Sequence, residues 1–163
     1  MIMRLFKRNT LLQRFPDVKF YNPKLTEVQE HVNIGYGTRV GSFTLIQQGV
    51  KIGSNCTIGS HCNIAADVKI GDHVSIQTGC HITKGVQIGS DCFIGPGVIT
   101  MNSKFMDGNL EAPVIGNNTK IGGGSCILPS VRIGSNVFVG SGAIVTKDIP
   151  DGKKVLGNPA RPF

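Results

Sequence analysis

A strict six-residue period dominates this sequence. Stepping by six from Ile34, every position up to Ile94 is aliphatic, and the same holds from Ile115 to Val145. The residue after each aliphatic one is usually Gly or Ala, and the residue two before it is small or β-branched. A helix repeats every 3.6 residues and a strand every two, so neither period explains the six. The chain therefore repeats a supersecondary unit.

A short strand followed by a turn that favours glycine explains the hexad. Three such units close a triangular coil of about eighteen residues. Successive coils pair as parallel strands about 4.7–4.9 Å apart, and their aliphatic side chains point inward and stack. Burying each of these side chains stabilises the fold by about 1.5–3 kcal/mol. We therefore expect an all-β protein, a parallel β-helix of hexapeptide repeats whose ends need covering.

The cysteines fit the same pattern. Four of them occupy the small inward position two before the aliphatic residue, and Cys126 does not; the four are Cys56, Cys62, Cys80 and Cys92. The sequence contains no CxxC motif and no cysteine–histidine pair at zinc-site spacing. We expect reduced cysteines that pack as small hydrophobic side chains.

The net charge of +7 suggests an anionic partner. A phosphate-rich cofactor, an anionic membrane surface or nucleic acid would suit it, although solvated charges need no partner. We expect residues 1–23 to form a basic N-terminal arm that caps the coil, and residues 24–163 to form the β-helix domain. No run of about 18 apolar residues occurs, and the basic start lacks the apolar core of a signal peptide. The sequence thus predicts a cytoplasmic protein without membrane insertion.

The six-residue period fails once, between Thr100 and Val114. The aliphatic residues return in step on both sides of this segment. We predict that about residues 101–114 leave the coil as an extruded loop. A single interruption in so regular a chain is the place where we expect the chemistry.

The hexads VKIGSNCTIGSHCNIAADVKIGDHVSI and the ending GSGAIVTKDIPDGKKVLGNPARPF resemble the hexapeptide-repeat acyltransferases. The resemblance covers about residues 24–163. It implies a left-handed coil, acetyl-CoA as co-substrate, and a homotrimer with active sites between adjacent prisms. VNIGYGTRVGSFTLIQQGVKIG and GPGVITMN look most like N-acetyltransferases of nucleotide-linked 3-amino sugars, which serve lipopolysaccharide or glycoprotein glycan assembly. The resemblance therefore implies a nucleotide-linked amino sugar as acceptor, and not nucleic acid.

Within that family an Asn follows the Gly-Pro pair and opens the excursion, and Asn102 matches this position. The chain also departs from the pattern. The family's paired Asn is replaced by Thr78 and Gly79, and the loop is shorter and lacks the usual Pro-Arg. These departures leave the identity of the sugar open.

The residue after Asn102 bears on the reaction. Acetyl transfer passes through a tetrahedral oxyanion. A hydroxyl acceptor needs a general base, usually His, whereas an amine with a pKa of about 8 can attack unaided. The O-acetyltransferases of this fold carry Asn-His here, but this chain has Asn102-Ser103 and no His after His81. The sequence therefore favours direct attack of an amine on the thioester.

Four residues are candidates for the acceptor side of the site. We expect Asn102 to orient the amine through its side-chain carbonyl, although Asn is also common in turns. His81 should face outward and is the only candidate base. Asp107 and Glu111 lie on the excursion and could bind the sugar or accept a proton, with plain surface solvation as the alternative.

Five residues are candidates for the cofactor side. Gly123 and Ser141 are eighteen apart and should stack, which would let the pantetheine arm approach the backbone. Alternatively, the turn at Gly123 simply requires glycine. Thr146, Lys147 and Arg161 match positions that in the family lie near the nucleotide end of acetyl-CoA, where a cation suits phosphate.

Two other functions stay open. An O-acetyltransferase of a sugar or xenobiotic would use His81 or a histidine from a partner subunit. A non-catalytic β-helix scaffold is the third possibility, and the ending GNPAR speaks against it. We expect no metal, because the H-x4-H spacing of the zinc carbonic anhydrases on this fold is absent.

Overall fold

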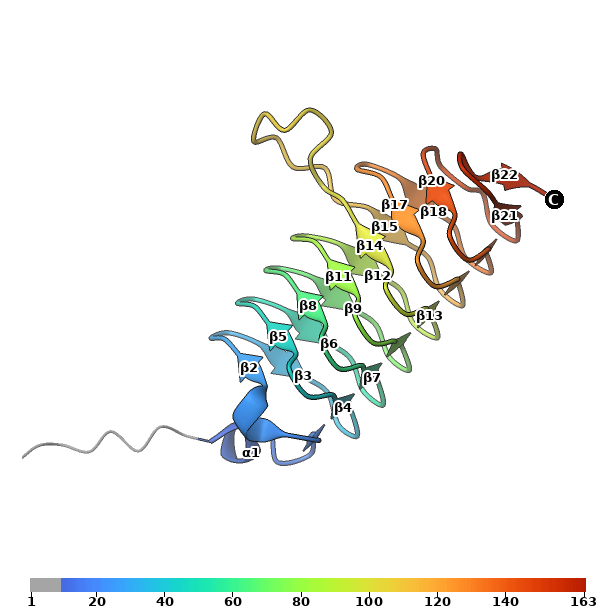
Figure 1. The fold of residues 1–163 in the computed structure, drawn as a ribbon. Helices are drawn as coiled ribbons and strands as arrows, with labels where there is room; N and C mark the ends of the chain where they lie inside the picture. Colours follow the sequence, from blue (N-terminus) through green and yellow to red (C-terminus); the bar gives the residue numbers. More distant parts are fainter. Residues whose placement is uncertain (1–9) are drawn as a thin grey trace, which may run out of the picture.

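Short parallel strands stack along three faces of a prism in the computed structural model, which describes residues 10–163 (Figure 1). Pairing joins residues one coil apart: Ser75 pairs with Phe93, and Ile76 with Ile94. This offset of eighteen residues confirms the triangular coil predicted from the hexads. The chain forms a left-handed parallel β-helix.

The three faces are sheets that we name A, B and C. Sheet A contains β1 (Lys19–Phe20), β4 (Arg39–Val40), β7 (Thr57–Ile58), β10 (Ser75–Ile76), β13 (Phe93–Ile94), β16 (Lys120–Ile121), β19 (Phe138–Val139), β21 (Lys154–Leu156) and β22 (Arg161–Pro162). Sheet B contains β2 (Glu27–Val28), β5 (Leu45–Ile46), β8 (Asn63–Ile64), β11 (His81–Ile82), β14 (Ile99–Thr100), β17 (Cys126–Ile127) and β20 (Ile144–Val145). Sheet C contains β3 (Asn33–Ile34), β6 (Lys51–Ile52), β9 (Lys69–Ile70), β12 (Gln87–Ile88), β15 (Val114–Ile115) and β18 (Arg132–Ile133).

The core is a set of side-chain columns that run the length of the prism. All the aliphatic residues of the hexad positions are buried except Ile34, which is half-buried. The small inward positions hold Val, Thr and the four predicted cysteines, whereas Cys126 points outward from β17. Burial raises the pKa of the Cys56 and Cys92 thiols, which keeps them protonated at neutral pH. The expected role of these cysteines as small core residues is confirmed.

A short helix covers the first coil. The predicted arm, residues 1–23, contains α1 (Leu11–Arg14), β1 and the start of the 3₁₀ turn η1 (Pro23–Leu25). The guanidinium of Arg14 donates to the carbonyl oxygens of Val28 and Gln29, both at 2.8 Å, which fixes α1 over the end of the prism. The first nine residues, which include the basic residues Arg4, Lys7 and Arg8, lie outside the described residues. Within residues 10–163 no helix has the length and hydropathy needed to cross a bilayer.

The glycine after each inward aliphatic residue lets adjacent coils approach closely. A Cβ added to Gly122 would lie 2.4 Å from the backbone nitrogen of Ser141 in the next coil. No side chain fits at that distance, so the hexad requires glycine here for contact between coils as well as for the turn.

The column architecture makes the energetic effect of a core truncation predictable. We expect Ile76→Ala, at a fully buried position of β10, to lower the free energy of unfolding by about 2–5 kcal/mol, because it opens a cavity between two stacked Ile side chains. Lys69→Ala, on the outward position of β9, is the matched control and should change it by less than about 0.5 kcal/mol. Equal effects in urea unfolding experiments would contradict the inward–outward assignment.

Candidate functional site on sheet B

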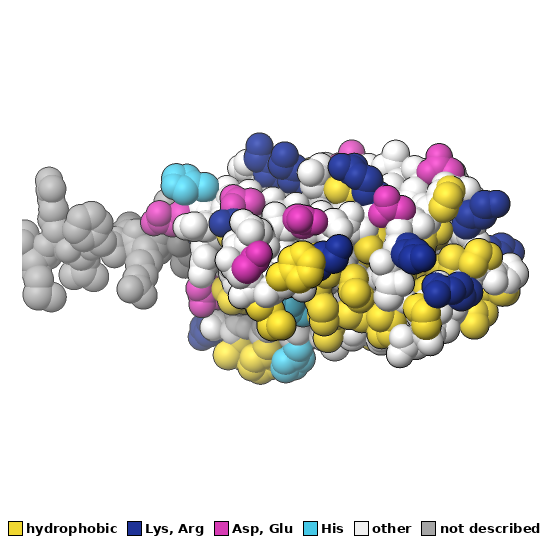
Figure 2. Space-filling model, turned by 90° about the horizontal axis from the view of Figure 1, so that it is seen from above, with side chains coloured by type: hydrophobic (Ala, Val, Ile, Leu, Met, Phe, Trp, Pro, Cys, Tyr) yellow, Lys and Arg dark blue, Asp and Glu magenta, His cyan; other side chains and the backbone are white. Residues whose placement is uncertain are grey.

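The outer face of sheet B differs in charge from the other two faces. Its outward strand positions carry no Lys or Arg: they are Glu27, Leu45, Asn63, His81, Ile99, Cys126 and Ile144. Sheets A and C present basic residues at the same positions, among them Arg39, Lys51, Lys69, Lys120, Arg132 and Lys154. Figure 2 shows hydrophobic side chains gathered along the side of the prism that sheet B faces. The predicted site residues lie on this face, at one of its two corners or on the loop that leaves it, except Arg161, which is in β22 of sheet A at the C-terminal end of the prism.

The predicted loop leaves the coil after β14 and rejoins it at β15, at the corner between sheets B and C (Figure 1). Thr100 explains why the chain can leave here without disturbing the core. It occupies an inward position in place of an aliphatic residue and is fully buried. Its hydroxyl accepts a hydrogen bond from the backbone nitrogen of Thr83 at 2.8 Å and bonds the Thr83 hydroxyl at 2.9 Å. The hydroxyl thus takes over a bond that a backbone carbonyl accepts in regular coils.

Asn102 is held firmly at the neck of the loop. Its side-chain amide donates to the carbonyl oxygen of Lys84 at 3.0 Å, and its backbone carbonyl accepts from the backbone nitrogen of Glu111 at 2.7 Å. The carbonyl of Glu111 in turn accepts from Ser130 at 2.7 Å. Among residues 10–163 no donor reaches the side-chain carbonyl oxygen of Asn102, so this oxygen stays available to an outside donor.

Asp107 and Glu111 occupy different parts of the loop. The carboxylate of Asp107 accepts from the backbone nitrogen and the side-chain amide of Asn109, each at 3.0 Å, and these bonds lower the pKa of Asp107. Glu111 lies at the neck beside Asn102 and lines a hollow of about 330 Å³ with Arg132. The fold therefore brings Glu111 and Asn102 together, and leaves Asp107 in the outer part of the loop.

His81 faces outward, as predicted, and its side chain is exposed. It lies on the face of sheet B between Asn63 and Ile99, with which β11 pairs. Three residues later the chain reaches Lys84, whose carbonyl holds Asn102. His81 and the neck of the loop thus share one face, with His81 nearer the corner between sheets A and B.

Gly123 and Ser141 stack at the corner between sheets A and B, as predicted: the backbone nitrogen of Gly142 donates to the carbonyl of Gly123 at 2.9 Å. Within residues 10–163 no acceptor takes the N–H group of Gly123 or that of Ser141. From Ser54 to Ser135 the equivalent N–H groups at the corner between sheets C and A are bonded, for example Ser54 to Asp72 at 2.7 Å. The corner between sheets A and B therefore offers backbone N–H donors to a ligand.

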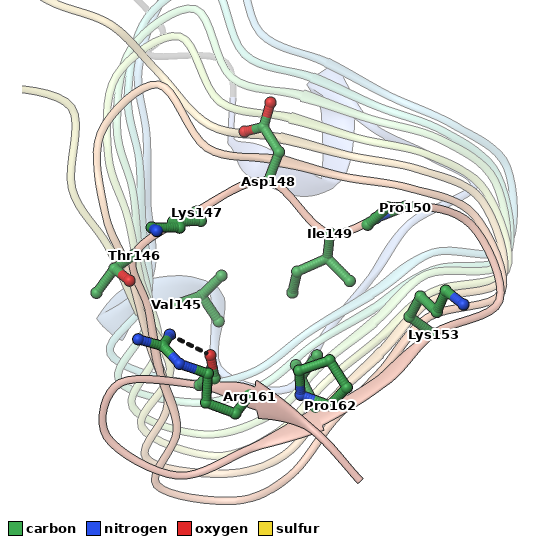
Figure 3. Close-up of a pocket in the computed structure, with 11 residues that line it drawn as sticks. Val145, Thr146, Lys147, Asp148, Ile149, Pro150, Lys153, Arg161 and Pro162 are labelled. Atoms are coloured by element: carbon green, nitrogen blue, oxygen red, sulfur yellow. Dashed lines mark hydrogen bonds between the residues drawn. The ribbon is translucent and has the colours of Figure 1, made fainter.

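Thr146, Lys147 and Arg161 surround a hollow of about 420 Å³ at the C-terminal end of the prism (Figure 3). Val145, Ile149 and Val155 line it with apolar side chains. The tail after β21 runs beside β20, where the backbone nitrogen of Ala160 donates to Ile144 at 2.8 Å. This path brings Arg161 to the same side of the hollow as Thr146 and Lys147, opposite Lys153 (Figure 3). The rim carries three cations, Lys147, Lys153 and Arg161, and one carboxylate, Asp148. An apolar floor with a net positive rim fits a group that carries phosphates.

Sequence reasoning missed two features of this face. Lys84 fixes Asn102 through its carbonyl, and its ammonium lies 3.7 Å from Asp67. Phe43 and His61 stack on each other at the corner between sheets A and B. The eighteen-residue spacing could have predicted both features, because it places Lys84 beside Asn102 and Phe43 beside His61. No group of three His, Cys, Asp or Glu side chains in the described chain is arranged to hold a metal ion.

Comparison with solved structures gives similar proteins over most of the chain. The acetyltransferase domain of PglB from Neisseria gonorrhoeae FA1090, in complex with acetyl coenzyme A, is 25% identical, with a TM-score of 0.64 over 90% of this chain and 58% of that one. WeeI from Acinetobacter baumannii AYE is 27% identical, with a TM-score of 0.60 over 85% of this chain and 55% of that one. A maltose O-acetyltransferase from Clostridium difficile 630 is 25% identical, with a TM-score of 0.50 over 86% and 70%.

The chain spans less than two thirds of the length of the PglB domain and of WeeI. No curated protein sequence matches it. The description "bacterial transferase hexapeptide (six repeats)" matches residues 27–66, 67–100 and 112–147, which are most of the chain and leave out the loop. The protein therefore belongs to the bacterial transferase hexapeptide family.

Proposed function

We propose that the protein is an acetyl-CoA-dependent N-acetyltransferase that acts on the amine of a nucleotide-linked amino sugar for surface glycan biosynthesis, such as that of lipopolysaccharide. The observation that carries the proposal is the state of Asn102: its amide is bound to the Lys84 carbonyl and its carbonyl oxygen is available. That oxygen is an acceptor for an amine N–H, and the loop around it contains no histidine.

In the proposed reaction the acceptor amine donates one N–H to the side-chain carbonyl of Asn102, which directs its lone pair at the thioester. The N–C bond forms, the carbonyl becomes an oxyanion, and the C–S bond then breaks to release coenzyme A as thiolate. The amine proton passes to the thiolate or to water. No side-chain base is required, because an amine with a pKa of about 8 is partly unprotonated near neutral pH.

We place acetyl-CoA along the corner between sheets A and B and at the C-terminal end. The N–H groups of Gly123 and Ser141 face the amide carbonyls of the pantetheine arm. Thr146, Lys147 and Arg161 lie at the nucleotide end, where the ammonium and guanidinium neutralise phosphate. The PglB domain, similar over 90% of this chain, binds acetyl coenzyme A.

We further propose a homotrimer in the cytoplasm, where acetyl-CoA is available. Sheet B is the face without basic residues in its outward strand positions, so it can approach another prism without repulsion between like charges. Ile99, on β14 next to the central strand β11, is 44% exposed. A cleft between two prisms would join the sheet A–B corner of one protomer to the loop of its neighbour and supply the concavity that ligand sites need.

O-acetylation is the second candidate, because His81 is exposed on the same face and the maltose O-acetyltransferase is similar to this chain. In that reading His81 is the base and Asp107 and Glu111 bind the sugar. Incubation with acetyl-CoA and matched amino and hydroxy sugars separates the two. Thiol release with hydroxy sugars alone, abolished in His81→Ala, would replace our proposal.

The proposal predicts a specific loss for Asn102→Ala. We expect kcat/KM for the amino sugar to fall at least about tenfold, since the variant loses an interaction that aligns the amine in the transition state. Ser103→Ala, in the same loop, serves as the control and should stay within about twofold of the wild type. Steady-state thiol release measures both. A wild-type kcat/KM in Asn102→Ala would remove this residue from the mechanism.

The assignment of Lys147 and Arg161 to the nucleotide end of acetyl-CoA predicts a rise in KM that depends on which acetyl donor is used. Lys147→Gln and Arg161→Gln should each raise KM for acetyl-CoA roughly tenfold, because each removes a charge-assisted bond to phosphate. With S-acetyl-pantetheine, which lacks the nucleotide, the same variants should match the wild type. Lys69→Gln on sheet C is the control for a change in net charge. Equal losses with both donors would show that these residues do not contact the nucleotide end.

A further inference from the structure

The corner between sheets A and B carries an exposed pair of stacked rings near its N-terminal end. Phe43 and His61 lie one coil apart, with ring centroids 4.8 Å apart and an angle of 12° between the ring planes. The side chain of Phe43 is 54% exposed, and that of His61 is exposed as well. Stacked rings open to solvent form a platform that suits a third planar ring.

Both rings stand at backbone positions of the left-handed region, with φ of 57° at Phe43 and 55° at His61. Asn, Asp and His are the residues most often found there, and Phe is rare. At the corner between sheets C and A the same positions hold Asn55, His73 and Asp91. The feature that sets this corner apart is Phe43, which gives His61 a second ring to stack on.

The stack of rings ends at His61, because the next coil has a glycine at the equivalent position. This glycine is Gly79, and a Cβ added there would find its nearest heavy atom at 4.0 Å, the backbone nitrogen of Gly97. Adjacent coils lie about 4.8 Å apart, close to the separation of the two rings. The space over Gly79 can thus receive a planar group stacked on the open face of His61.

We propose that this space binds the nucleobase of the acceptor, stacked on His61 with Phe43 behind it; the inference rests on the proposed function. The base would lie in the same coil as His81, two residues from Gly79. Five residues beyond Gly79 is Lys84, whose carbonyl holds Asn102. The diphosphate and sugar can therefore extend across the face of sheet B towards the loop.

The adenine of acetyl-CoA is a poorer occupant of this platform. The cationic hollow lies at the C-terminal end of the prism. His61 and Gly142 occupy equivalent positions four coils apart, which is a distance of about 19 Å along the prism. A cofactor with its phosphates at Lys147 and Arg161 has its adenine at that distant end.

Binding measurements with nucleoside diphosphates test the inference directly. By isothermal titration calorimetry, UDP or GDP should bind the wild type more tightly than inorganic pyrophosphate does, because only the nucleotides carry a base. His61→Asn removes the ring, and Gly79→Asn fills the space over the turn; Asn tolerates positive φ in both. Each should raise the Kd of the nucleotide about tenfold, within the range of base–aromatic stacking, and leave pyrophosphate binding unchanged.

Matched controls lie at the corner between sheets C and A. His73→Asn has the same backbone conformation, with φ of 55°, and Gly152→Asn adds a side chain in open space; both should bind nucleotide like the wild type. Nucleotide affinity equal to that of pyrophosphate, or unchanged in His61→Asn and Gly79→Asn, would overturn the proposal. So would a loss of coenzyme A binding in His61→Asn with UDP and GDP unaffected.

An activity assay separates this proposal from the proposed function. If His61→Asn acetylates a UDP- or GDP-linked amino sugar with unchanged KM, stacking is refuted while N-acetyl transfer stands. If the wild type binds UDP or GDP through His61 but acetylates no amine, the transfer reaction is refuted and the base site stands.

Discussion

In-register stacking of successive coils is the interaction on which the rest of this structure depends. In the regular coils each residue lies beside the residue eighteen positions later, as Ser75 lies beside Phe93, and across the loop the offset grows to 27, as between Phe93 and Lys120. A column of like side chains is therefore the unit of the core, and a column of turn residues is the unit of each corner. Because the backbone of every coil is nearly the same, function can be introduced only by the residues placed in a column or by leaving the coil.

The three corners show how far one backbone can be differentiated in this way. Between sheets C and A, side-chain oxygens such as those of Asp72 and Asp151 accept the N–H groups of the preceding coil, so this corner is closed. Between sheets A and B the corresponding N–H groups of Gly123 and Ser141 have no acceptor among the described residues. The difference between a corner whose N–H groups are bonded and one whose N–H groups have no acceptor comes from the turn residues.

The coil, its inward columns and the extruded loop could be predicted because they repeat, or break, a six-residue pattern that the sequence displays directly. Asn102 was found at the neck of the loop by resemblance, but not the means by which it is held. Its bond to the Lys84 carbonyl, and the Thr100 hydroxyl that replaces a backbone acceptor, depend on neighbours one coil away. The Phe43–His61 pair was missed for the same reason. The six-residue period does not show which side chains become neighbours because they are eighteen residues apart.

The position of the break follows from the same geometry. A loop inserted in the middle of a face would interrupt hydrogen bonds to two neighbouring coils, whereas one inserted at a corner replaces a turn. The chain leaves between β14 and β15, and both strands still pair with their neighbours, β17 and β12. The prism therefore stays continuous through the interruption. Asn102 stands on a well-bonded base even though the loop beyond it leaves the coil, and the proposed positioning of an amine against a thioester would require such a base.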